Sequence, residues 1–103
     1  MYSIYANLYA DDSDDDSVSD YIVSYKHPNN YETIHEAMHI YNVWLPNKDD
    51  IKKDVMAHAK AYPHSKIDLE IGIWDDAIDE CVEYTNCTVY EEGQYLAPEN
   101  ARF

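Results

Sequence analysis

Basic side chains are scarce in this chain of 103 residues. Seven Lys and Arg residues stand against 21 Asp and Glu residues, and the formal net charge is −14. Nucleic acids and anionic membranes are themselves negatively charged, so this balance disfavours both as direct ligands. Solubility of a small domain needs a net charge of only about 2–8. The excess acidity therefore predicts a basic protein surface as the partner.

Glycine and cysteine are also rare, and this excludes several kinds of site. Two glycines cannot form a glycine-rich phosphate loop. Cys81 and Cys87 are the only cysteines, so neither a disulfide framework nor a zinc knuckle is expected. The start of the chain lacks a basic region, and no apolar run approaches membrane-spanning length. These absences predict a cytoplasmic protein.

The hydrophobic content predicts one folded domain over residues 1–103. Hydrophobic residues make up 46% of the chain, which is enough for one modest core. Residues 11–20 contain six aspartates and are expected to form an exposed acidic loop. Residues 93–103 are expected to form a loose tail.

Three segments have the pattern of β-strands. Residues 2–9 and 21–25 are rich in aromatic and aliphatic residues and predict a hairpin with the acidic loop at its tip. His27-Pro28-Asn29-Asn30 predicts a turn. Residues 67–73 alternate between isoleucine or leucine and polar or small residues, which is typical of a half-buried strand. A last short strand at residues 88–90 is an open alternative.

Three other segments favour helices. The first begins near Tyr31 and ends before Pro46, and the second follows an Asn47 or Asp49 cap and ends at Pro63. The third is expected from Asp75 to about Tyr84. The fold class predicted is therefore α+β, with about three strands, an N-terminal hairpin plus one central strand, and three helices. A mostly α fold is the alternative.

The first predicted helix contains the sequence His35-Glu36-Ala37-Met38-His39. It matches H-E-x-x-H, in which two histidines bind zinc and the glutamate activates water. Catalytic zinc usually needs a third protein ligand, and no downstream residue is marked as one. We therefore expect no metal, no cofactor and no catalysis. A minimal zinc hydrolase that uses His35 and His39 stays open as the alternative.

The acidic residues occur in clusters along the chain. Those between residues 75 and 83 have i,i+3 and i,i+4 spacings. Like charges so placed destabilise a helix, so a helix that keeps them is consistent with a functional use. Fourteen net charges match roughly 24 Å of duplex DNA, or about seven base pairs. The expected partner-binding residues are Asp11, Asp12, Asp14, Asp15, Asp16, Asp20, Asp49, Asp50, Asp54, Asp68, Glu70, Asp75, Asp76, Asp79, Glu80, Glu83, Glu91 and Glu92.

About half of the chain resembles the Ocr-like phage antirestriction proteins. The similar residues are Ile34-His35-Glu36-Ala37 with His39, Pro46, Asp50-Ile51, Val55-Met56-Ala57, Ile67-Asp68-Leu69-Glu70, Trp74, Asp76-Ala77, Asp79 and Glu83-Tyr84. The resemblance implies a phage-encoded DNA mimic whose carboxylates replace phosphates and block the DNA-binding groove of a host enzyme.

Charge and resemblance together predict an acidic inhibitor in the host bacterial cytoplasm. Its partner would be the basic DNA-binding surface of a restriction-modification enzyme or a CRISPR effector, without direct contact to nucleic acid or membrane. A homodimer is left open as an alternative. A phage structural or adaptor protein that binds through its eleven tyrosines is a further alternative.

Overall fold

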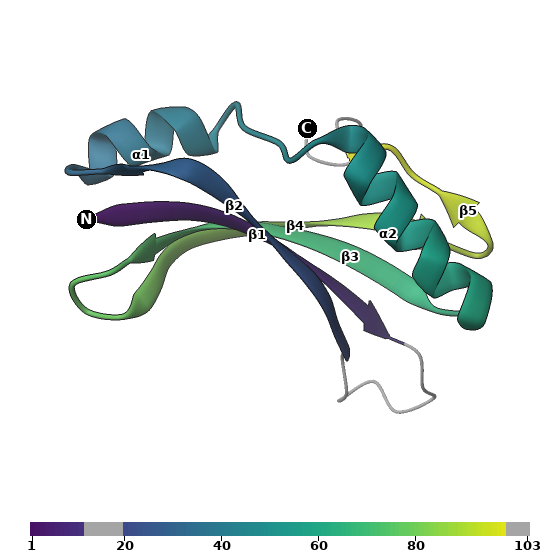
Figure 1. Ribbon diagram of the computed structural model, residues 1–103. Helices are drawn as coiled ribbons and strands as arrows, with labels where there is room; N and C mark the ends of the chain where they lie inside the picture. The colour runs from purple at the N-terminus through teal and green to yellow at the C-terminus, as the bar shows by residue number, and fades with distance from the viewer. Residues whose placement is uncertain (12–19, 99–103) are drawn as a thin grey trace.

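The computed structural model, which describes residues 1–11 and 20–98, is built on one antiparallel sheet (Figure 1). The strands are β1 (Tyr2–Asp11), β2 (Asp20–Tyr31), β3 (Lys66–Asp75), β4 (Glu80–Glu91) and β5 (Gln94–Tyr95), in the spatial order β2-β1-β3-β4-β5. Helices α1 (Ile34–Tyr41) and α2 (Lys48–Ala61) connect β2 to β3. Both helices lie on the same side of the twisted sheet, which leaves the other side open (Figure 1).

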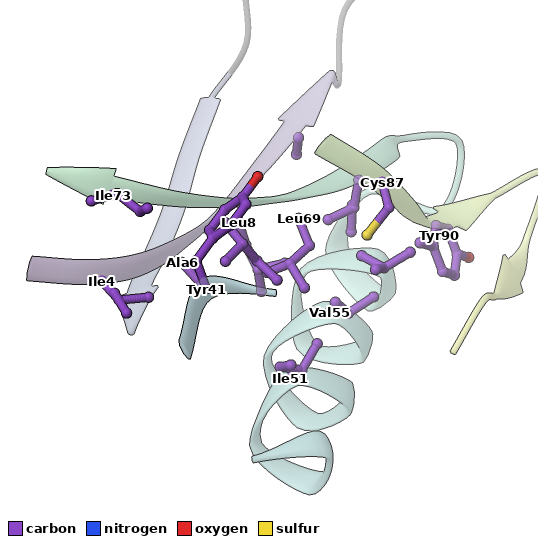
Figure 2. Close-up of a cluster of buried hydrophobic side chains, with 14 of the residues drawn as sticks. Ile4, Ala6, Leu8, Tyr41, Ile51, Val55, Leu69, Ile73, Cys87 and Tyr90 are labelled. Atoms are coloured by element: carbon purple, nitrogen blue, oxygen red, sulfur yellow. The ribbon is translucent and has the colours of Figure 1, made fainter. Parts of the chain in front are cut away.

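Strict alternation in β1 and β3 produces the two different faces of the sheet. Ile4, Ala6, Leu8 and Ala10 of β1 are buried, as are Ile67, Leu69, Ile71 and Ile73 of β3. Successive side chains of a strand point to opposite faces, so these residues all face the helices. Figure 2 shows this apolar cluster between the sheet and α2. The polar and aromatic residues between them lie on the open face.

The helices begin at capping side chains and bury one face each. Thr33 accepts a hydrogen bond from the Glu36 backbone N–H at 3.2 Å and starts α1. Asn47, one of the two caps that the sequence left open, accepts from the backbone N–H groups of Asp49 and Asp50 and starts α2. The residues that the two helices bury against the sheet are Ala37, Tyr41, Ile51, Val55 and Ala59.

The predicted fold class, with about three strands and three helices, is wrong. The part of the chain that the structure describes contains five strands and two helices and is mostly β. The mostly helical alternative is wrong for the same reason. The expected N-terminal hairpin is present, because β1 and β2 pair antiparallel, and the expected central strand is β3.

The main error is the helix predicted from Asp75 to Tyr84. Asp75 ends β3, a short turn follows, and Glu80 begins β4, which pairs with β3 through Trp74–Cys81 and Asp75–Glu80. A helix over these residues would have crowded like charges at i,i+3 and i,i+4 positions. The strand continues into Thr85, Thr88 and Val89, whose β-branched side chains favour a sheet, so β4 also extends well beyond the short strand expected at 88–90.

The turn predicted at residues 27–30 is also wrong. These residues lie within β2, where the register shifts between the pairs Ser3–Asn30 and Tyr5–Lys26. Pro28 is tolerated there because β2 is an edge strand and the irregularity removes the need for a regular ladder hydrogen bond. A bulge thus replaces the expected turn.

The segments expected to be an acidic loop (residues 11–20) and a loose tail (residues 93–103) are partly ordered where the structure describes them. Asp11 and Asp20 belong to β1 and β2, and the rest of the predicted acidic loop lies outside the described residues. The tail expected to be loose from Gly93 first forms β5 and then buries Pro98 completely. Within the described ranges, neither helix has the length and apolarity required to cross a membrane.

Candidate functional site

The open face of the sheet brings side chains from four strands into rows. Directly paired residues of neighbouring strands share a face. One row runs Lys26–Tyr5–Gly72–Tyr84 from β2 to β4, and the row beside it runs Ser24–Asn7–Glu70–Asn86. Polar, aromatic and acidic groups are therefore neighbours on this face, although they are far apart in sequence.

Tyr5 lies across β3 at Gly72. The Tyr5 ring occupies the space that a β-carbon on residue 72 would need. Its hydroxyl donates to Glu70 Oε1 at 2.8 Å, and its oxygen lies 3.1 Å from Cys81 Sγ. Burial raises the pKa of Tyr5 above its usual value, and the contacts with Cys81 and Glu70 raise it further. Tyr5 is thus a neutral donor that holds the Glu70 carboxylate in place.

Trp74 forms a corner with Tyr5. The two ring centroids are 6.5 Å apart and the rings are 80° to one another, an edge-to-face arrangement. The Trp74 indole N–H donates to Asp79 Oδ1 at 3.2 Å. Ser3 Oγ lies 2.9 Å from one carboxylate oxygen of Asp76 and 3.1 Å from the other. The acidic β3–β4 turn is therefore tied to the open face through Trp74 and Ser3.

These side chains line a hollow of about 430 Å³ on the open face. A volume of this size is at the lower end of the range of small-molecule sites. Its walls carry both aromatic rings and carboxylates. The lining residues are Ser3, Tyr5, Asn7, Tyr9, Ser24, Lys26, Glu70, Trp74, Asp76 and Cys81.

Nine of the eighteen predicted partner-binding acids lie on one half of the sheet, on β3, β4 and the turns that follow them. No Lys, Arg or His occurs between Lys66 and Arg102, the segment that supplies β4, β5 and nearly all of β3. Glu70, Asp68 and Asp75 are half-buried, and the other acids of this half are exposed. Its described acidic residues are Asp68, Glu70, Asp75, Asp76, Asp79, Glu80, Glu83, Glu91 and Glu92.

The acids of α2 have a different environment. Asp49 and Asp50 are exposed in its first turn, where they complement the helix dipole. Asp54 is half-buried and accepts a hydrogen bond of 2.6 Å from the Tyr25 hydroxyl of β2. Helix α2 also carries four of the seven basic residues, at positions 48, 52, 53 and 60. Its lysines therefore balance its aspartates, and the excess negative charge lies elsewhere.

The acids at the tip of the first hairpin are only partly described. Asp12, Asp14, Asp15 and Asp16 lie outside the described residues. Asp11 is half-buried at the end of β1, and its Oδ1 has no hydrogen-bond partner among the residues that the structure describes. Asp20 is the first residue of β2.

The histidines of the H-E-x-x-H sequence lie on α1, on the other side of the sheet from Glu70. His35, Glu36 and His39 are exposed and border a shallow hollow with Tyr31 and Ile40. Across residues 1–11 and 20–98, no group of three or more His, Cys, Asp or Glu side chains is arranged to hold a metal ion. The zinc alternative therefore has no third protein ligand in the described part of the chain.

Sequence reasoning missed the hollow itself. The sequence places Tyr5 in an expected strand and Cys81 in the helix expected from Asp75 to Tyr84, and it marks neither residue, nor Trp74, as part of a binding site. One signal was present: an isolated glycine in an alternating strand, Gly72, often marks the close approach of another group. That signal does not say which residue approaches, because the partner comes from β1.

Comparisons with models of protein families, with curated proteins and with solved structures find no match to this chain.

Proposed function

We propose that this protein is an acidic, non-catalytic inhibitor that mimics DNA. It binds the basic DNA-binding groove of a host defence protein, a restriction-modification enzyme or a CRISPR effector, and blocks the binding of nucleic acid. It would act in the cytoplasm of the bacterial host.

The separation of charge within the fold carries this proposal. From Asp68 to Glu92 the chain has nine acidic residues at described positions and no basic one. Six of these residues lie on β3 and β4 and three lie in the turns that follow these strands, while four lysines lie on α2. A surface of one sign attracts an oppositely charged groove and raises the rate of association. If the same charges were spread evenly over the molecule, no single face would be attracted to the groove.

The size of the molecule supports the same reading. Its longest extent is 41 Å, which exceeds the roughly 24 Å of duplex that carries fourteen phosphate charges. The exposed carboxylates of Asp76, Asp79, Glu80 and Glu83 lie on one β-hairpin. Glu80 and Glu83 are paired with β3, and Asp76 and Asp79 accept hydrogen bonds from Ser3 and Trp74. These charges are therefore held in place rather than carried on a flexible tail.

Competition with DNA tests the proposal directly. Fluorescently labelled target DNA is bound to purified restriction-modification enzymes and CRISPR effectors, and its polarisation is measured as the full chain is added. We expect displacement from at least one of these proteins. The concentration needed for half displacement should rise about tenfold or more between 50 and 200 mM KCl, because the interaction is electrostatic.

Two variants with the same change of charge provide the control. Glu80→Gln with Glu83→Gln should weaken displacement by about threefold or more, since both side chains lie on the acidic half. Asp49→Asn with Asp50→Asn removes two charges from α2 and should have a smaller effect. Equal effects of the two pairs, or no displacement from any enzyme of either class, would contradict the proposal.

A further inference from the structure

The hollow on the open face has an aromatic corner. Gly72 lets the Tyr5 ring lie across the sheet, and the Trp74 ring stands at 80° to it. One ring forms a floor and the other forms a wall. The negative π faces of tyrosine and tryptophan attract cations that come within about 6 Å of the ring centroid.

Carboxylates are fixed at the borders of this corner. The Tyr5 hydroxyl holds Glu70, Ser3 holds Asp76, and the Trp74 indole holds Asp79. These hydrogen bonds restrain the rotation of the three carboxylates. The negative groups are therefore already in position before a ligand arrives, and binding loses less side-chain entropy.

Lys26 is the one basic side chain among the described residues that line the hollow. It is exposed on β2, in the same row as Tyr5 but on the opposite side of Tyr5 from Gly72. Glu70 and Asp76 also line the hollow, and Asp79 adjoins it through Trp74. The carboxylates thus outnumber the ammonium group, and a cationic ligand has the complementary charge.

We propose that this hollow binds an arginine side chain of a basic partner protein, with the guanidinium stacked in the Tyr5–Trp74 corner and hydrogen-bonded to Glu70. Arginine fits better than lysine because its flat guanidinium stacks on aromatic rings, donates a fork of hydrogen bonds to a carboxylate and is less strongly hydrated. The assignment of this arginine to a DNA-binding groove rests on the proposed function. The preference of the hollow for arginine is argued from its own side chains and does not depend on that function.

A peptide titration tests the hollow without the partner. The ¹⁵N-labelled full chain is titrated with Ac-Gly-Arg-Gly-NH₂ at low salt, and the Trp74 indole N–H resonance is followed by NMR. A parallel titration uses the same peptide with citrulline, which keeps the shape of arginine but is uncharged. We expect saturable shifts at Trp74 and Glu70 with the arginine peptide, and binding at least about threefold weaker with citrulline.

Matched variants separate the hollow from the overall charge. Glu70→Gln and Glu91→Gln each remove one negative charge, but Glu91 is at the far end of β4 beside β5. Glu70→Gln should weaken arginine binding about threefold and Glu91→Gln should change it much less. Lys26→Gln should strengthen it, because a repulsive charge is removed from the border.

The outcomes distinguish this inference from the proposed function. Equal binding of both peptides, equal effects of the two glutamine variants, or no shift at Trp74 would overturn the arginine site. DNA displacement that persists in such a case would leave the inhibitor proposal standing. Arginine binding in the hollow without any displacement of DNA would support the site and count against the inhibitor.

Discussion

The ring of Tyr5 lies over Gly72, its direct cross-strand partner, so closely that a β-carbon at position 72 would be 2.7 Å from Tyr5 Cε1. Aromatic residues across from a strand glycine cover the backbone that the glycine exposes. Here the same contact directs the Tyr5 hydroxyl to Glu70. One missing side chain thereby shapes the candidate site.

Gly72→Ala should destabilise the fold through this contact. The added methyl group must displace the Tyr5 ring, and overpacking of this kind costs about 1–3 kcal/mol. In a Tyr5→Ala background the same substitution should instead be neutral or stabilising by about 0.5 kcal/mol, because alanine is less flexible than glycine in a strand. Urea denaturation of the four proteins measures the coupling. Additive effects would show that the two residues do not interact.

Alkaline pH should weaken the fold through its half-buried tyrosines. Burial raises the pKa of Tyr25, and its hydrogen bond to Asp54 raises it further. The folded protein then keeps a proton that the unfolded chain loses above about pH 10, so the stabilisation is complete below that pH and is lost as pH rises. Tyr25→Phe should flatten the decline of unfolding free energy by at most about 1.4 kcal/mol per pH unit, less where solvent screens the group.

Denaturation at pH 8, 9.5, 10.5 and 11 checks this dependence. Tyr62→Phe is a suitable control, because Tyr62 is 52% exposed at the end of α2. Its slope should match that of the unmodified protein. A Tyr25→Phe slope that is no flatter than the control would contradict the role of the Tyr25–Asp54 pair.

The start of α2 depends on the Asn47 side chain, which accepts from two backbone N–H groups. Asn47→Ala should cost about 1 kcal/mol of unfolding free energy, the typical loss for a removed N-cap. Asn47→Asp should restore it, because aspartate also accepts these bonds and its charge favours the helix N-terminus. Thermal and urea unfolding distinguish the two. An alanine variant as stable as the aspartate variant would mean that the cap contributes nothing.

Salt should stabilise this protein. The repulsion among its acidic groups, at a net charge of −14, opposes the compact state and is screened by ions. Raising KCl from 20 to 500 mM should increase the unfolding free energy by roughly 1 kcal/mol. The variant with Asp76→Asn, Glu80→Gln and Glu83→Gln should gain less. A midpoint of urea unfolding that is independent of KCl would show that the repulsion is negligible.

Local sequence patterns predicted those strands and helices whose periodicity and capping residues lie within the element itself. Alternation identified the strand that contains Leu69, and capping with a period of 3.6 identified the α2 helix that begins after Asn47. The same reasoning failed at Asp75–Tyr84, where a possible cap at Asp75 predicted a helix and the structure has a turn followed by the start of β4. The pairing of Trp74 with Cys81 that makes this segment a hairpin is a contact between strands, and periodicity within either segment does not contain it.

The candidate site divides in the same way. The sequence by itself determined that the protein is acidic, that basic residues are absent between Lys66 and Arg102, and which residues alternate into the core. Only the tertiary structure decided that Tyr5, Glu70, Trp74 and Cys81 surround one hollow. They come from β1, β3 and β4, and they meet only because these strands pair in one particular register. A slip of one residue would turn the side chains of the shifted strand to the opposite face of the sheet.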